Sequence, residues 1–482
     1  MCEHLSPCPT IEESNKRAKI ESTPSPIELP KCQYIKPKNG KKCRLQVRKG
    51  QTYCFAHISV INGNSKEQNG KEDTEKDLDD GITRVKRNGN IVKRVKCTID
   101  PSHTVWEDKL SLHLKKCNVL KKRLAVEEME KSCSWFSIDY NVKDAKDCNA
   151  EEKTIDNNSW KTCIDAWVKK HDEVYAEQLE LPLRNVNFKD GLEGRFAEVT
   201  NQKHIKQQSS LIGQLVEFGL VSKKERPEIV IEFGCGRAEF TRYLNKAMAK
   251  YCVDETTKED LYLFVDRENP RLKFDTKMGE DVEKDEDGGR NVIVERLKVD
   301  IKDLILAASL KELHQKAQSG KGNKKYIGIS KHLCGVATDL TLRCLENAVK
   351  DSNLDLKFAG CLVAMCCRHG CKYEWLLEDS KQYLKEKFDI DHTNFIYFRK
   401  MFAWATNGVA PGKTLDDGAD CHFTGMSFGE RENVGLKMRR ILDESRKYAM
   451  ERKGFNVSLL RYVSRDVSLE NNCIVIKSRE TV

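Results

Sequence analysis

The chain has 482 residues, of which 33% are charged, and a formal net charge of +9 at pH 7. No window approaches the roughly 18 consecutive apolar residues of a membrane span, and the N-terminus lacks a charged-then-apolar secretory signal. We therefore expect no membrane association and an intracellular protein, nuclear or cytoplasmic. In such a reducing compartment the 20 cysteines favour metal sites or buried thiols over disulfides. The length predicts more than one folded unit.

The N-terminal 58 residues divide into a tail and a cysteine-rich segment. Residues 1–30 are rich in Pro, Ser, Glu and Lys without an apolar period, which predicts a disordered tail. Residues 31–58 have the pattern C-x10-C-x10-C-x2-H, formed by Cys32, Cys43, Cys54 and His57. Four such ligands suit tetrahedral Zn²⁺, and so short a segment has too little apolar content to fold unaided. We predict a structural zinc finger here.

A polar linker, residues 59–90, separates this segment from a second one at 91–122. The second pattern is C-x5-H-x9-H-x3-C, formed by Cys97, His103, His113 and Cys117, and it predicts a second structural zinc finger. In each segment the last two ligands are three or four residues apart, so we expect each pair on one helical face. Lysine and arginine are dense in and before both segments, as in proteins that attract a phosphate backbone, although a solvated surface would look similar.

The rest of the chain is predicted to form a helical connector, residues 123–222, and an α/β domain, residues 223–482. Helical periodicity is clearest over 159–179, 209–221 and 435–454. Short apolar runs alternate with helical patterns, as in a parallel sheet; they are residues 228–234, 260–266, 291–300, 325–332 and 358–365. Two further runs, 455–463 and 473–478, predict an antiparallel pair. The acidic insert 275–290 predicts a mobile loop.

A glycine turn follows the first predicted strand. Glu232, Gly234 and Gly236 lie in the pattern E-x-G-x-G-x-A, where glycine allows a sharp turn and a close approach to a ligand. The pattern lacks the G-K-[ST] ending of a nucleotide triphosphate loop. Asp266 and Asp300 end the next two strands, where carboxylates can hold a ribose and an adenine amine. Together they predict an S-adenosylmethionine site, with Glu232 near the methionine ammonium.

These segments resemble a known family. Both cysteine and histidine patterns, "IEFGCGRAEFTRYL", "SKHLCGVATDLTLRCL" and "AMCCRHGC" occur in this order in eukaryotic tRNA 2'-O-methyltransferases that modify the fourth nucleotide of the acceptor stem. The resemblance implies a Rossmann-like class I methyltransferase sheet, two zinc ions, S-adenosylmethionine as cofactor and tRNAs such as those for glycine, proline and histidine as substrates. The second zinc pattern also resembles the CHHC finger of RNA-associated proteins. No obligate protein partner is evident.

Residues at the ends of the fourth and fifth strands are candidates for the transfer chemistry, because ligands bind outside these ends in open α/β sheets. They are Lys331, His332, Arg368 and His369. Either histidine could accept the hydroxyl proton, and Lys331 could lower the pKa of the alcohol. The common Lys-Asp-Lys-Glu set of such enzymes is not matched, since Lys331 and His332 occupy the place of its aspartate.

The cysteines of "AMCCRHGC" are the other feature of this region. Cys366, Cys367 and Cys371 with His369 could bind a third zinc, but adjacent residues of a strand point to opposite sides, which favours a pocket wall. Two further hypotheses remain open for the whole chain. One is a protein or small-molecule methyltransferase with partner-binding fingers, and the other is a non-catalytic zinc-finger RNA adaptor.

Overall fold

The structure is a computed structural model of the whole chain. It describes residues 32–34, 42–43, 47, 52–53, 84–87, 90–145, 156–253, 259–268, 270–271, 273–283, 291–317, 324–406 and 422–479. The predicted tail at 1–30, most of the linker at 59–90, Cys54 and His57 lie outside these residues. The chain forms two compact units, Met1–Leu120 and Lys121–Val482. The domain limits expected at 58, 90 and 222 stay predictions.

The first unit contains a small antiparallel sheet followed by short helices. Its strands are β1 (Arg84–Arg87), β2 (Asn90–Lys96) and β3 (Thr104–Trp106), in the order β1-β2-β3. The turn η1 (Glu107–Lys109) and helix α2 (Leu110–Leu114) follow, and α3 (Asn118–Ser132) leads into the second unit. The expectation that His113 and Cys117 share a helical face is wrong, because α2 ends at Leu114 and Cys117 lies in the turn before α3.

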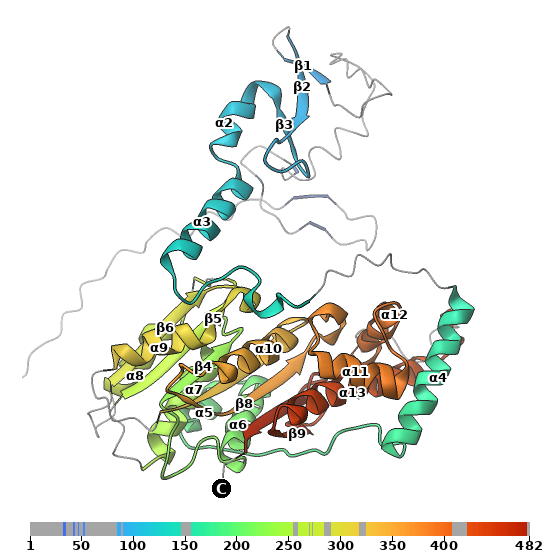
Figure 1. The fold of residues 1–482 in the computed structure, drawn as a ribbon. Helices are drawn as coiled ribbons and strands as arrows, with labels where there is room; N and C mark the ends of the chain where they lie inside the picture. Colours follow the sequence, from blue (N-terminus) through green and yellow to red (C-terminus); the bar gives the residue numbers. More distant parts are fainter. Residues whose placement is uncertain are drawn as a thin grey trace, which may run out of the picture. The chain divides into compact units, whose positions relative to one another are not determined.

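The second unit is built on a seven-stranded sheet (Figure 1). Its strands are β4 (Ile229–Phe233), β5 (Glu259–Asp266), β6 (Asn291–Lys298), β7 (Lys325–Cys334), β8 (Lys357–Cys366), β9 (Phe455–Arg461) and β10 (Asn472–Ser478). They lie in the order β6-β5-β4-β7-β8-β10-β9. The first five are parallel, and β10 is antiparallel to both β8 and β9. Five parallel strands with a terminal antiparallel pair is the predicted arrangement.

Helices cover both faces of this sheet because its strands are apolar on both sides. The helices of the unit are α4 (Asn157–Tyr175), α5 (Glu193–Glu198), α6 (Lys203–Glu217), α7 (Glu239–Tyr251), α8 (Asp275–Glu283), α9 (Leu306–Lys316), α10 (Ala337–Lys350), α11 (Glu378–Phe388), α12 (Phe395–Lys400) and α13 (Phe428–Arg452). One core joins Ile231 to residues of α9 and α10. The opposite core joins Val230 to residues of α6 and α7.

Short 3-10 turns complete the unit, and a third core lies away from the parallel strands. The turns are η2 (Tyr140–Val142), η3 (Ile301–Asp303), η4 (Arg368–Gly370), η5 (Tyr373–Trp375) and η6 (Met401–Ala405). The third core gathers aromatic and aliphatic side chains of α4, α11, α12, η6 and α13. Among the described residues, every helix is either too short or too polar to cross a bilayer.

The acidic insert is partly helical, which corrects the loop expected over 275–290. Residues Asp275–Glu283 form α8, and residues 284–290 lie outside the described part. Met278 is fully buried against the α7 side of the sheet. Asp281 accepts two hydrogen bonds from Arg242 of α7, at 2.6 and 2.8 Å. One buried methionine and a two-point ion pair therefore hold this acidic segment, neither of which its composition reveals.

Candidate active site at the ends of the parallel strands

The chain after β4 makes the sharp glycine turn that the sequence predicts. Gly234 and Gly236 have φ of 62° and 49°, values that favour glycine. The amide of Gly236 donates to Asp266 Oδ2 at 2.7 Å, so the end of β5 fixes the turn. Arg296 of β6 donates to the Gly236 carbonyl at 2.8 Å and to Cys235 Sγ at 3.0 Å. This role of Arg296 was not predicted from the sequence.

Three of the predicted cofactor residues line one cavity of about 220 Å³. Gly234 comes from the turn, Asp266 from the end of β5 and Asp300 from just after β6. Asp266 Oδ1 also accepts from the Glu268 amide at 2.8 Å, and Asp300 Oδ1 accepts from the Lys302 amide at 3.1 Å. Both carboxylates are thus oriented by backbone amides and keep acceptor capacity for hydroxyl or amine donors. Arg267 also lines the cavity, with its guanidinium 3.9 Å from Asp300 Oδ2, and most of the other lining residues are apolar: Val265, Val299, Ile301, Leu333, Val336, Ala337 and Leu340.

Glu232 lies outside the lining of this cavity, and its expected contact with the methionine ammonium stays a prediction. Its side chain is buried beneath the turn, where its carboxylate accepts from the hydroxyl of Thr241 and, at 3.3 Å, from the Thr241 amide. Burial raises its pKa to about 7, although the Thr241 hydrogen bonds and the charges of Arg296 and Lys331 act in the opposite direction. Glu232 therefore ties β4 to the start of α7 and is not among the residues that line the cavity.

Lys331 and His332 lie near the end of β7, at a backbone irregularity. The register with β8 shifts between Lys331 and Leu333, and His332 has φ of 68°, a conformation uncommon for a residue with a side chain. His332 lines the cavity with Asp266 and Asp300. Burial, together with the charge of Lys331, lowers the pKa of His332 to about 4, so this imidazole is neutral at physiological pH.

Lys331 meets residues of the helices on the other face of the sheet. Its Nζ lies 3.4 Å from Nδ1 of His204, on α6, a residue that the sequence did not single out. Burial lowers the pKa of Lys331 to about 8; Glu239 and Glu232 partly offset this effect, and Arg195 adds to it. The pKa of this amine is thus close to neutral pH, as an efficient general base requires. The charge of Lys331 in turn lowers the pKa of His204.

Arg368 does not face the cavity, which corrects its assignment as a transfer residue. Its guanidinium is buried and pairs with Asp443 of α13 at 2.7 Å and with Glu470 at 3.3 Å. Burial alone would raise the pKa of Asp443, but the charges of Arg368 and Arg446 outweigh it and keep the pKa low. Arg368 is therefore part of an interior ion-pair network that connects η4 to α13.

His369 lies on the exposed side of the same turn. It is not among the residues that line the cavity, although the two strand ends are close: a Cβ on Gly335, after β7, would lie 3.5 Å from the Gly370 Cα. The structure thus brings η4 beside the end of β7 as predicted from the strand order. Of the two predicted bases, only His332 reaches the cavity.

The cysteines at these strand ends are arranged differently from the expectation. Cys367 has φ of 43°, so the chain turns between Cys366 and Cys367, and their sulfurs do not point to opposite sides. Together with Cys334 they form a group whose Sγ atoms all lie within 4.8 Å of one another. Cys371, in contrast, is buried in the aromatic core around α11 and α13.

The second zinc pattern converges on one point in the first unit. Sulfur and imidazole atoms of Cys97, His103, His113 and Cys117 all lie within 4.8 Å of one another. The Nε2 atoms of His103 and His113 are 3.0 Å apart, near the ~3.3 Å separation of two nitrogens that bind one Zn²⁺. Asp100 Oδ2 lies 3.1 Å from His103 Nδ1, which leaves Nε2 for the metal. The four residues fit a closed tetrahedral zinc site.

Only part of the first zinc pattern is described. Cys32 and Cys43 are buried and pack with Val47, Tyr34 and Tyr53. The Cys43 amide donates to the Tyr34 carbonyl at 2.8 Å, and the Gln33 amide to Thr52 at 3.1 Å. Cys54 and His57 lie outside the described residues, so the zinc ion of this first pattern stays a prediction.

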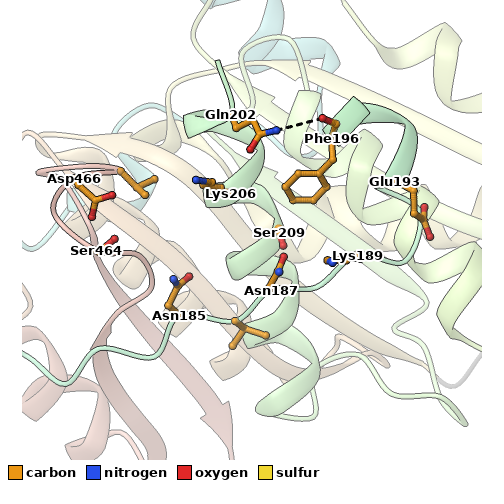
Figure 2. A pocket seen from close by; sticks show the side chains of 12 residues that line it. Asn185, Asn187, Lys189, Glu193, Phe196, Gln202, Lys206, Ser209, Ser464 and Asp466 are labelled. Atoms are coloured by element: carbon orange, nitrogen blue, oxygen red, sulfur yellow. Dashed lines mark hydrogen bonds between the residues drawn. The ribbon is translucent and has the colours of Figure 1, made fainter. Parts of the chain in front are cut away.

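A larger cavity of about 680 Å³ lies between the segment before α6, α6 itself and the loop after β9 (Figure 2). It is lined by Gln202, directly before α6, and by Lys206 and Ser209 of α6; these residues lie on one side of the helix, whereas His204 lies on a different face. Its lysines, Lys189 and Lys206, are matched by two acids, Glu193 and Asp466. This cavity lacks both the strand-end carboxylates and a net positive lining, so size alone does not mark the active site.

The strand order, the glycine turn after β4 and the acids after β5 and β6 define a class I methyltransferase sheet, whose ligands bind at the carboxyl ends of the strands. The family described as Methyltransferase TRM13 matches residues 206–477, and a U11-48K-like CHHC zinc finger matches residues 94–118. The chain belongs to the TRM13 methyltransferase family, and its second unit is an enzyme domain.

Curated relatives match along almost the whole chain. A tRNA:m(4)X modification enzyme TRM13 from Yarrowia lipolytica is 32% identical, covering 96% of this chain and 92% of the relative. The Saccharomyces cerevisiae protein of the same name is 33% identical, with 97% and 99% covered. The Schizosaccharomyces pombe protein is 30% identical, with 80% and 96% covered.

Solved structures offer a weaker likeness. The plantazolicin methyltransferase BpumL in complex with SAH is 10% identical, with 67% of this chain and 98% of that chain covered and a TM-score of 0.22. An O-methyltransferase family protein from Burkholderia thailandensis is 11% identical, with 66% and 72% covered and a TM-score of 0.21. Scores this low add nothing to the fold assignment, which rests on the strand order and the family.

Proposed function

We propose that this protein transfers a methyl group from S-adenosylmethionine to the ribose 2'-hydroxyl of the fourth nucleotide in the tRNA acceptor stem, in tRNAs such as those for glycine, proline and histidine. The observation that carries the proposal is membership of a family whose curated relatives are named tRNA:m(4)X modification enzymes and match over nearly their full length. A tRNA substrate also agrees with an intracellular location.

The cavity at the strand ends suits the nucleoside part of the cofactor. Asp266 would accept the ribose hydroxyl hydrogens, and Asp300 the exocyclic amine, because both keep free acceptor positions in an apolar surround. The left-handed glycines allow the backbone to approach the ligand without a side chain in the way. When bound, the sulfonium of this cofactor supplies an electrophilic methyl group.

The chain's own part in the transfer is to position the alcohol and remove its proton. We place Lys331 as the proton acceptor, since an amine with a pKa of about 8 is partly neutral at physiological pH. His332, which is neutral and lines the cavity, would accept a hydrogen bond from the ribose of the tRNA. This bond would hold the 2'-hydroxyl in line with the methyl group and the sulfur of the cofactor. His204 contacts Lys331 and would keep its amine oriented.

The zinc fingers supply the proposed RNA contact. Lys93, Arg94 and Lys96 lie on β2, directly before the CHHC ligands. Arg94 stacks over Trp106, with its guanidinium carbon 5.3 Å from the ring centroid. Such a charged strand attracts phosphates without selecting sequence, so specificity would come from the shape of the tRNA.

Incubation of unmodified tRNA with the enzyme and methyl-labelled cofactor, followed by nucleoside mass spectrometry and position mapping, tests the proposal. We expect label on the 2'-oxygen of nucleotide 4. Label on a base or on copurified protein would favour the alternative methyltransferase with partner-binding fingers. Absence of both label and cofactor binding by calorimetry would favour the RNA adaptor.

A further inference from the structure

Three thiols converge where β7 and β8 end. Cys334 and Cys366 are partners in the parallel register of the two strands, and their Sγ atoms are 3.0 Å apart. The left-handed turn at Cys367 returns the chain, so that its sulfur joins the same group, with all three sulfurs within 4.8 Å. Three sulfurs this close, contributed by two strands, form a set of soft ligands at a single point.

The spacing of the sulfurs agrees with a common metal. In a tetrahedral thiolate site the sulfurs are about 3.8 Å apart, given Zn–S bonds of about 2.3 Å. Cys334 Sγ and Cys366 Sγ are 3.0 Å apart, and all three sulfurs lie within 4.8 Å of one another, so the group is compact enough to surround one ion after small side-chain adjustments. A disulfide accounts for the group less well, because it needs an S–S distance of about 2.05 Å and would leave the third thiol without a role.

The backbone around the group is held in place by a charged network. Glu470 accepts a hydrogen bond from the Cys367 amide at 3.2 Å. The same carboxylate receives two bonds of 2.8 Å from Arg439 and one of 3.3 Å from Arg368. Because these arginines hold Glu470, it is engaged as a support for the turn, in the way that neighbouring carboxylates orient the ligands of metal sites.

We propose that Cys334, Cys366 and Cys367 bind a zinc ion through three thiolates. Cys334 also lines the cofactor cavity, so the fourth coordination position faces this cavity and takes a water molecule. The ion joins the ends of β7 and β8 and fixes the turns that carry His332 and His369. This site is separate from both N-terminal zinc patterns, and it does not depend on tRNA being the substrate.

Metal analysis of the full-length protein tests the site by comparing the zinc content of the unchanged protein with that of two cysteine variants. Zinc is measured per chain, under reducing conditions, in the unchanged protein, in Cys366→Ser and in Cys163→Ser, whose cysteine lies on α4 outside the group. We expect Cys366→Ser to lose one zinc per chain and Cys163→Ser to lose none. Equal zinc in all three proteins, or copper in place of zinc, would overturn the proposal.

A second measurement needs no substitution. Cysteine alkylation is followed by peptide mass spectrometry with and without a chelator. Cys334 is exposed, so we expect metal to slow its alkylation and the chelator to accelerate it, while the rate at Cys163 stays unchanged. Equal rates at Cys334 in both conditions, or a mapped Cys334–Cys366 disulfide in the reduced preparation, would contradict a bound metal.

Discussion

The active-site edge of the sheet has two halves that are built in different ways. In the cofactor half, formed by the ends of β4, β5 and β6, glycines adopt the left-handed turns and backbone amides orient two carboxylates. In the transfer half, formed by the ends of β7 and β8, Gly335 is left-handed too, but so are two residues with larger side chains, His332 and Cys367. The acids that line the cavity from the first half, Asp266 and Asp300, lie outside the left-handed turns, whereas His332 of the second half lines the cavity from a left-handed position.

The difference has an energetic consequence. A residue with a side chain held in a sparsely populated conformation costs of order 1–3 kcal/mol, and such residues persist where the surroundings fix them. At Cys367 the fixing contact is the Glu470 carboxylate, held in turn by Arg368 and Arg439. The transfer half therefore depends on a buried ion-pair network behind it, whereas the glycine turn of the cofactor half is held by Asp266 and Arg296 from the neighbouring strands.

Replacement of Lys331 by methionine is expected to produce the largest loss of activity. Removing a general base lowers kcat by about 10²- to 10⁴-fold, and cofactor affinity should change little because Lys331 is not among the residues lining the cofactor cavity. Single-turnover kinetics with calorimetry checks both quantities. Lys350→Met, on the exposed end of α10, serves as the matched control and should retain full activity.

The pH profile sharpens this test. The charged groups around Lys331 are Glu232 on β4, Glu239 on α7 and Arg195 on α5, with the titratable His204 on α6. With a pKa of about 8, about a tenth of the amine is neutral at pH 7, so kcat should rise with pH and level off above about 8. Lys331→Arg should remove this rising limb, because arginine stays protonated. If kcat of Lys331→Arg still rises with pH, another group accepts the hydroxyl proton.

Arg368→Met tests whether the buried ion pairs of Arg368 stabilise the turn after β8. Removal of one partner leaves the buried Asp443 without its closest cation, and such changes cost about 3–5 kcal/mol of unfolding free energy. Urea unfolding, followed by the fluorescence of the tryptophans in the second unit, measures the loss of unfolding free energy. Lys381→Met, whose partner Glu378 is exposed, should stay within about 1 kcal/mol of the unchanged protein. A stable but inactive Arg368→Met would instead return this residue to the transfer chemistry.

The sequence predicted the cofactor half far better than the transfer half. Alternating apolar runs fixed the strands, and Gly234, Asp266 and Asp300 line one cavity because strand-end positions follow directly from strand order. The hydrogen bonds of Glu232 could not be predicted, because their donor belongs to another element: Thr241, in the first turn of α7, donates to the carboxylate. A local pattern contains no information about such a partner.

In the transfer half the missing information was the backbone turn. Alternation along a strand places Cys366 and Cys367 on opposite sides, and only the left-handed conformation of Cys367 reverses this. Arg368 was a candidate because it follows the end of the fifth strand, yet it pairs in the interior with Asp443, 75 residues away in the sequence. The involvement of His204 likewise depends on α6 packing beside β7, a contact between residues 127 positions apart.

Asp266→Ala tests the cofactor half. The substitution removes the acceptor for the Gly236 amide and the proposed ribose contact together. Hydrogen bonds to a charged group contribute about 1.5–3 kcal/mol, so cofactor affinity should fall about 100-fold. Calorimetric titration with S-adenosylmethionine measures the change, and Glu268→Gln, a neighbouring exposed acid, should bind normally. Unchanged affinity in Asp266→Ala would show that this cavity does not hold the ribose.

The smallest expected effect separates the two predicted histidines. His332→Ala should lower kcat about 10-fold, because a single positioning hydrogen bond contributes of order 1 kcal/mol, while cofactor affinity is kept. His369→Ala should stay close to full activity, since its side chain is exposed outside the described cavity. His332→Asn, which can still accept a hydrogen bond, should restore part of the rate if the role is positioning. Equal loss in both alanine variants would mean that η4 reaches the substrate, so that the turn after β8 acts on the ribose together with the end of β7.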